Sequence, residues 1–253
     1  MALPGIGSVE ISYKRPPITE AVIEFRFAQP LELSTVEKAR DGFSKEFSTV
    51  AKLEQLEWQI GGDPVHPSVN TFTAGFRLHN ADSSEIIIIS AFTLSFSTVA
   101  PYKGWATFSD SAMKIYGCFR ELVGYTQISR IGLRYINRLD IPQTNPPSLI
   151  RLEDYIKIHP NYPEDVLPAL GAFTVQCVFT LPEGNTTATI SVASVASPLP
   201  THFSILLDID IGRVNDVPQK ESEIREVLDV MRGQKNRIFE QCITDASKET
   251  FNS

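Results

Sequence analysis

Hydrophobic and polar residues alternate along several stretches of the chain, the pattern of strands that bury one face of a sheet. In 19–27 the alternation separates apolar side chains, expected to face a core, from charged ones: Ala21, Ile23, Phe25 and Phe27 against Glu20, Glu24 and Arg26. Later strand-like stretches lie at 56–60, 71–78, 85–90, 92–97, 130–139, 172–181, 186–195 and 202–212. The chain is therefore expected to be rich in antiparallel strands.

Apolar residues that recur at intervals of three and four predict helices at about 35–47, 112–123, 148–157 and 218–247. Residues 216–219 resemble a capping box, in which two side chains satisfy the first free backbone donors, so the last helix is predicted to begin there. At ~1.5 Å per residue it would be long enough to lie across a whole sheet. Its final turns, from Lys235 to Lys248, are polar on one side and predict a solvated face.

The order of these elements predicts an α+β fold. Each half reads strand, helix, three or four strands, helix, which predicts two α+β pseudo-repeats, 1–127 and 128–253, packed as one continuous unit. Together they would form a large curved antiparallel sheet with helices on one face and a long C-terminal helix. That order looks like the saddle of the TATA-binding protein and resembles helix-grip folds, analogies of fold that carry no function.

Four short segments are similar, in the same order, to landmarks of a known family: 16–26, 101–105, 131–138, and 236–239 with 243–245. That family is a sporadically distributed group of uncharacterised prokaryotic proteins of about this length. The resemblance spans nearly the whole chain and implies no activity. The family's patchy distribution is typical of genes that travel, such as defence, toxin–antitoxin or mobile-element cargo.

Composition and charge narrow the class of protein. The 253 residues include 23 Lys plus Arg against 30 Asp plus Glu, a net charge of −7, and the hydrophobic fraction of 42% is that of an ordinary globular chain. An acidic balance disfavours general binding to nucleic acid or to anionic membranes. No stretch approaches the ~20 apolar residues of a membrane span, and no signal peptide is visible. Three distant cysteines indicate reduced thiols, so a cytoplasmic location is expected.

Motifs of catalysis and of cofactor binding are not found. The four histidines are scattered without zinc-ligand spacing, and the glycine-rich stretches do not open a helix as a phosphate loop does. No Gly-x-Ser-x-Gly elbow is present. We therefore expect no catalytic residue, metal or cofactor, and a binding protein is favoured over an enzyme.

Charged residues on the predicted sheet are the first binding candidates. The three arginines four residues apart in 130–138 must project from one face of a strand. The candidates that share faces in this way are Glu24, Arg26, Arg130, Arg134, Arg138, Asp208 and Asp210. One interpretation is a solvated sheet face joined by cross-strand ion pairs, and the other is a charged platform that binds a polar partner. Because arginine recognises phosphate bidentately, a phosphate-containing ligand stays open as an alternative.

Tyr102 and Trp105 are the second candidates, in a loop rich in turn residues. Exposed, they would be an aromatic anchor of the kind that dominates protein interfaces. Buried, they would fix the start of the helix at 112–123.

These observations favour a non-enzymatic interaction protein that binds another protein through the polar sheet face or the aromatic loop. One alternative is a saddle-like nucleic-acid-binding protein, which the net charge disfavours. The other is a small-ligand-binding protein or enzyme with a cavity between the sheet and the long helix. No membrane association is expected, and the oligomeric state is left open.

Overall fold

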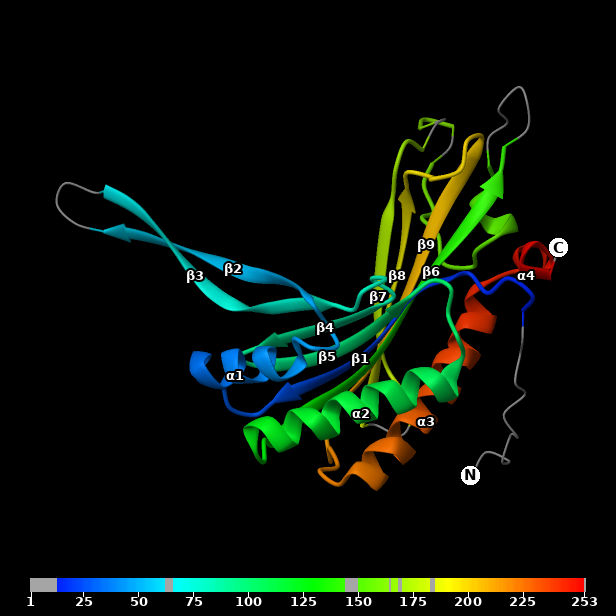
Figure 1. The fold of residues 1–253 in the computed structure, drawn as a ribbon. Helices are drawn as coiled ribbons and strands as arrows, with labels where there is room; N and C mark the ends of the chain where they lie inside the picture. Colours follow the sequence, from blue (N-terminus) through cyan, green and yellow to red (C-terminus); the bar gives the residue numbers. More distant parts are fainter. Residues whose placement is uncertain are drawn as a thin grey trace. The chain divides into compact units, whose positions relative to one another are not determined.

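A nine-stranded antiparallel sheet and four helices make up the computed structural model, which describes residues 13–61, 66–143, 150–163, 165–167, 170–182 and 185–252 (Figure 1). At 56–61 and 66–71 it describes the backbone alone. The α+β class, the antiparallel sheet and the long C-terminal helix are as predicted from the sequence.

The sheet is open, with β2 and β7 at its edges, and its strand order is β2-β3-β4-β5-β1-β6-β9-β8-β7. The strands are β1 (Ile18–Phe27), β2 (Thr49–Gly61), β3 (His66–His79), β4 (Glu85–Ser90), β5 (Thr93–Val99), β6 (Ile128–Pro142), β7 (Thr174–Thr180), β8 (Thr186–Val195) and β9 (His202–Arg213). The helices are α1 (Leu33–Phe43), α2 (Trp105–Val123), α3 (Glu221–Cys242) and α4 (Asp245–Asn252), with a 3₁₀ turn at Leu152–Asp154.

The chain forms two compact units, each assembled from separate segments. One contains residues 20–132 and 212–225, and the other contains 1–19, 133–211 and 226–253. We call them the central unit and the terminal unit. The predicted division at residue 127 into two pseudo-repeats stays a prediction.

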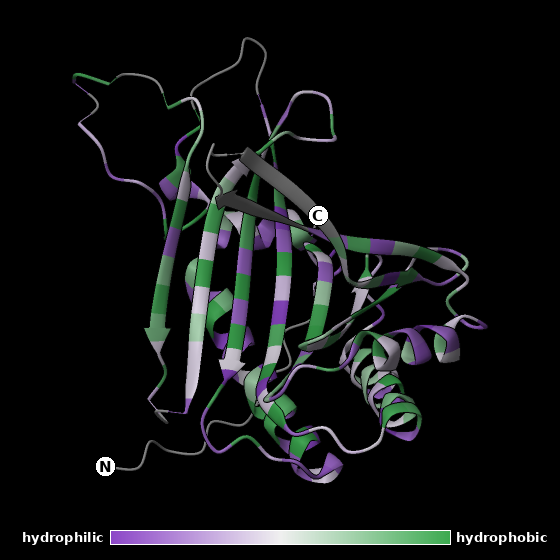
Figure 2. Ribbon diagram, turned by 90° about the vertical axis from the view of Figure 1, so that its left-hand side faces the viewer, coloured by the Kyte–Doolittle hydropathy of each residue, from purple (hydrophilic) through white to green (hydrophobic). Residues whose placement is uncertain are grey.

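In the central unit, the alternation in β1 decides which side chains reach the core. Ala21, Ile23 and Phe25 are buried, and the Phe25 ring lies 4.5 Å from that of Tyr116 in α2. Phe27 stacks on Phe119 one helical turn further along. Apolar and polar residues appear as alternating bands along the strands in Figure 2. The face opposite these aromatic rings carries the charged residues of β1.

In the terminal unit, the predicted helix at 218–247 is interrupted, which corrects the sequence-based expectation. Ile243 forms an isolated antiparallel bridge with Ile156. The Lys157 N–H donates to the Cys242 carbonyl, and the Thr244 N–H donates to the Tyr155 carbonyl. Because these backbone groups bond to a neighbouring segment, α3 ends at Cys242 and a separate helix, α4, follows.

The same bridge explains why the helix predicted at 148–157 is reduced to one 3₁₀ turn at Leu152–Asp154, since the backbone of Tyr155–Lys157 pairs with the end of α3 instead. Residues 148 and 149 lie outside the described part of the chain.

The predicted capping box at 216–219 is also wrong, because α3 begins at Glu221. The Gln219 amide instead accepts a hydrogen bond from the Ile128 N–H at 2.9 Å and donates to the Ile128 carbonyl at 3.0 Å. The Gln219 side chain therefore bonds to the backbone of Ile128, the first residue of β6, as the backbone of a neighbouring strand would.

Tyr13 and Arg15 lie against the last two helices of the terminal unit. Tyr13 packs edge-on against Phe239 and Phe251, and its hydroxyl donates to Glu240 at 2.5 Å. The Arg15 N–H donates to the Phe251 carbonyl in α4. Burial, with the neighbouring Glu240 carboxylate, raises the pKa of Tyr13, so this hydroxyl stays protonated. Residues 13–15 are thereby fixed to α3 and α4.

Candidate functional site

The three arginines of β6 lie on one face of that strand, as their spacing predicted. Its odd-numbered residues from Ile131 to Ile141 are buried, whereas the Arg134 side chain is 48% exposed. What the spacing could not specify is which carboxylate each guanidinium meets.

In the central unit, one carboxylate holds two arginines. Oε1 of Glu24 accepts a hydrogen bond from Arg26 Nε at 2.8 Å and another from Arg130 Nη1 at 2.7 Å. Arg26 is exposed, but only 15% of the Arg130 side chain is accessible. Glu24, Arg26 and Arg130 therefore form a compact charged cluster with one excess positive charge.

Two glycines make room for the Arg130 guanidinium. A Cβ added at Gly132 would lie 2.2 Å from Arg130 Nη1, and one added at Gly212 would lie 2.7 Å from Nη2. Any side chain at either position would displace the guanidinium, so these glycines let it lie close to the backbone. The position of Arg130 is thus set by β1, β6 and β9 together.

The terminal unit holds a second pair, between Arg134 and Asp208. Nε and Nη2 of Arg134 donate to Oδ1 and Oδ2 of Asp208 at 2.9 and 2.6 Å, the bidentate geometry that best fixes a guanidinium. Asp210 lies two residues along β9, so it shares the face of Asp208, and it is half-buried. Of the two predicted carboxylates, Asp208 is committed to an arginine.

Arg138 bonds within its own strand. Its guanidinium contacts Asp140 at 2.9 Å, and Asp140 also accepts a hydrogen bond from the buried Ser204 hydroxyl. Each arginine of β6 thus has a carboxylate against it, and a ligand phosphate would have to compete with these pairs.

Arg77 in β3 is a candidate that the sequence reasoning missed. It lies on the face opposite the buried Phe76 and Leu78, and the strand registers align it with Ile88, Ser95 and Glu24 on successive strands. Its Nε is buried without a hydrogen-bond partner, and no ion pair joins its guanidinium to another described residue. The available signal was the alternation in Phe76–Leu78, which puts a charged residue on the polar face.

The aromatic loop packs against its own helix. The rings of Tyr102 and Trp105 both meet Phe108 edge-on, with centroids 6.0 and 6.1 Å away. Trp105 is the first residue of α2, and both side chains are half-buried. This geometry matches the interpretation in which the loop fixes the start of the helix.

Lys235 contradicts the solvated helix face predicted for the last turns of α3. It is only 7% exposed, and its Nζ lies 3.9 Å from the centroid of the Tyr135 ring. The pKa of Lys235 is lowered to about 7, first by burial and then by the positive charge of Arg232, while Glu240 opposes the shift. The nearby Asn137 is also buried and donates to the Leu207 carbonyl at 3.0 Å. The helix–sheet contact of the terminal unit therefore contains polar groups.

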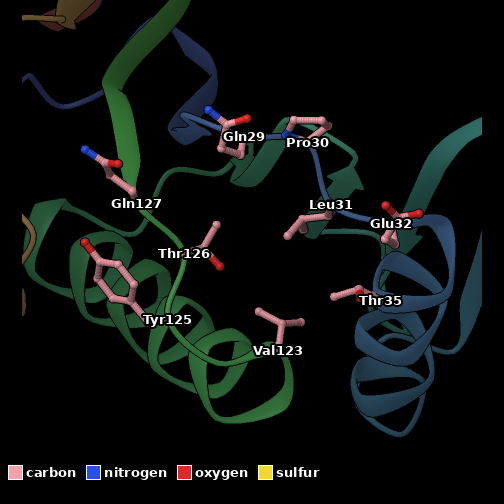
Figure 3. A pocket seen from close by; sticks show the side chains of 9 residues that line it. All are labelled: Gln29, Pro30, Leu31, Glu32, Thr35, Val123, Tyr125, Thr126 and Gln127. Atoms are coloured by element: carbon pink, nitrogen blue, oxygen red, sulfur yellow. The ribbon is translucent and has the colours of Figure 1, made fainter.

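A pocket of about 380 Å³ opens in the central unit where β1 ends and β6 begins (Figure 3). The side chains of Leu31, Val123 and Thr126 lie around its centre. Its lining consists of Gln29, Pro30, Leu31, Glu32, Thr35, Val123, Tyr125, Thr126 and Gln127. These are mostly neutral groups, which offer hydrogen bonds to a ligand but no paired acid and base. The pocket is not the one hypothesised between the sheet and the long helix, because α3 does not line it.

Within the part of the chain that the structure describes, no three His, Cys, Asp or Glu side chains are grouped to hold a metal ion. Among the described helices, none combines the length and the apolar character that a membrane crossing requires.

Comparison with models of known protein families finds no match for this chain, and comparison with curated proteins finds none either. The family resemblance of the four short segments stays a prediction.

Proposed function

We propose that the chain is a cytoplasmic, non-enzymatic binding protein that docks another protein through the polar faces of its strands. The observation that carries the proposal is the contrast among the arginines on these faces. Arg130 and Arg134 are held by carboxylates, whereas the Arg77 guanidinium has no such partner in the described residues. A partly buried guanidinium without a carboxylate favours a ligand that supplies one.

The paired arginines support the proposal in a different way. Bidentate and bridged pairs hold alternating charges in fixed positions, which favours a partner whose own charges are complementary. In the central unit, we therefore propose an acidic side chain of a partner against Arg77. In the terminal unit, the Arg134–Asp208 pair offers charged contacts of its own. A protein partner is favoured over nucleic acid because phosphates would meet Glu24, Asp208 and Asp140 beside each arginine.

The pocket of Figure 3 supports a small neutral ligand as a second candidate, since its glutamine and threonine side chains can donate and accept hydrogen bonds. It does not conflict with a binding role for the strand faces.

We expect charge reversal at Arg134 (R134E) to leave the protein folded and to remove partner binding. The pair with Asp208 is half-exposed and contributes at most about 1 kcal/mol to stability, but a reversed charge repels the group that met the arginine. The measurement is affinity purification from host cells, read by native mass spectrometry, followed by titration of the purified partner. Arg151→Glu is the matched control, because Arg151 is a more exposed arginine that pairs with Glu153 outside the sheet.

Arg77→Gln is expected to weaken partner binding roughly 30-fold. This is the effect of losing an interface arginine that contributes about 2 kcal/mol to the binding free energy. If the partner binds R134E and R77Q as tightly as it binds R151E, the proposed faces are not the docking surface. If no protein co-purifies and the chain is instead retained on DNA in a salt-sensitive way, the nucleic-acid alternative is the correct one.

A further inference from the structure

The two edges of the sheet differ in a way that points to self-association. The edge strand β2 carries Lys52 and Glu54, both exposed, and its pairing with β3 is interrupted by a register shift between Leu53 and Glu54. Charges and bulges of this kind protect an edge from pairing with another chain. The opposite edge strand, β7, has neither.

β7 is an uncharged strand with apolar side chains exposed. Its seven residues, Thr-Val-Gln-Cys-Val-Phe-Thr, contain no proline or glycine, and Val178 and Phe179 are 66% and 46% exposed. Among the described residues β7 pairs with β8 alone. An edge of this composition is a template for a further strand.

The pairing with β8 shows which backbone groups of β7 face outward. The Ser194 N–H donates to the Phe173 carbonyl, and the Leu181 N–H donates to the Thr186 carbonyl. In an antiparallel ladder the residues that exchange hydrogen bonds alternate with those that do not. The odd-numbered residues of β7 therefore bond to β8, and Thr174, Gln176, Val178 and Thr180 present their N–H and C=O groups at the open edge.

We propose that β7 pairs with β7 of a second copy of this chain, antiparallel and centred on Cys177. In that register each outward-facing residue meets an outward-facing residue, Gln176 against Val178 of the second copy and Thr174 against Thr180. All outward backbone groups of the strand are then satisfied. A shift by one residue would place outward groups against inward ones.

Side chains agree with this register. Val175, Cys177 and Phe179 pair with Val192, Ile190 and Ala188 of β8, all three of which are buried. The apolar face of the sheet thus continues onto β7, where Phe179 is uncovered. Self-pairing places Val175 beside Phe179 of the second copy, and no like charges meet. A partner strand from another protein would be an alternative occupant, but it would not require this two-fold match.

The register also predicts a distance. Cys177 lies opposite Cys177 of the second copy in a non-hydrogen-bonded pair, where Cα atoms are typically ~4.5 Å apart, within the range of a disulfide. Cys118→Ser/Cys242→Ser leaves Cys177 as the sole thiol. We expect mild oxidation of this variant to give a species of twice the 28.1 kDa chain mass on non-reducing electrophoresis.

Val178→Lys tests the edge in the reduced protein. Sedimentation velocity of the full chain is expected to give a dimer for the wild type and a dimer weakened at least about tenfold in Kd for V178K, because the lysines of the two copies approach on one face. Val230→Lys is the matched control, since Val230 is a comparably exposed valine on α3 (58%). Gln176→Glu/Val178→Lys is expected to restore the dimer, because each lysine then faces a glutamate of the second copy.

A wild type that is monomeric at tens of micromolar would overturn the proposal. A dimer that V178K leaves intact would also overturn it. The same holds for a dimer that forms no Cys177 cross-link and is not restored by the double variant, since both results place the interface elsewhere. A folded monomeric wild type that binds an extended peptide along β7 would assign the edge to a heterologous strand.

Discussion

Replacing Lys235 with methionine is expected to raise the free energy of unfolding by roughly 2–4 kcal/mol at pH 7. The folded protein holds this lysine almost fully buried, with its pKa lowered to about 7 from the ordinary 10.5. The contact of its ammonium with the Tyr135 ring offsets only part of the desolvation. Methionine keeps the length of the side chain and needs no proton to be removed on burial.

The pH dependence gives this prediction its sign. Between pH 7 and 10.5 the unfolded chain binds more protons at Lys235 than the folded chain does, so this group makes stability rise with pH. Its cost is full below pH 7 and disappears as the pH approaches 10.5. The advantage of K235M over the wild type is therefore expected to be largest at pH 6–7 and to shrink steadily toward pH 10.

Denaturant unfolding of both proteins from pH 6 to pH 10 measures this effect. Lys220→Met is the control, because the Lys220 side chain is 79% exposed and its replacement should change stability by less than about 0.5 kcal/mol at every pH. If the curves of K235M and the wild type run parallel across the range, Lys235 keeps an ordinary pKa in the folded protein.

Gly75→Ala is expected to lower the free energy of unfolding by about 2–4 kcal/mol. Gly75 is at the last pair shared by β3 and β4, opposite Ser90. A Cβ there would lie 2.3 Å from the Ile89 carbonyl oxygen and 2.9 Å from the Ser90 Cα. Both are backbone atoms, so β3 would have to move away from β4.

The control is the same substitution at a glycine with open space around it. Gly117 lies inside α2, and nothing would come within 4 Å of an added Cβ. Gly117→Ala should therefore stabilise the protein by up to ~1 kcal/mol, since alanine favours a helix over glycine. Equal and small effects at the two positions, measured by chemical denaturation, would contradict the close approach at Gly75.

The sequence predicted which face of a strand a side chain occupies, but it did not predict which residue that side chain contacts. Alternation placed Phe25 in the core and Glu24 on the opposite face, because successive side chains of a strand point to opposite faces of the sheet. It also put Arg134 and Arg138 on one face. It could not show that Arg138 bonds to Asp140 of its own strand while Arg134 reaches Asp208, 74 residues away. Ion-pair choice depends on distances between strands, which periodicity does not contain.

The predicted helix boundaries were wrong for a related reason. Gln219 fits a capping box by its spacing, but it bonds to Ile128, 91 residues earlier. Ile243 continues the apolar stripe of α3, but its bridge to Ile156 ends the helix. Lys235 reads as one polar residue among several, and only the packing of α3 onto β6 reveals that it is buried. In each case a backbone or side chain distant in sequence overrides the local preference.

The contacts of Tyr13 with α3 and α4 have a consequence for the order of folding during synthesis. The terminal unit needs Tyr13, at the start of the chain, and Phe239 and Phe251, near its end, before its aromatic contacts can form. Most of the central unit, by contrast, lies in the continuous segment 20–132. Because folding during translation proceeds from the N-terminus, segment 20–132 can begin to pack while the ribosome is still working. The terminal unit is completed only once the last helix has been released.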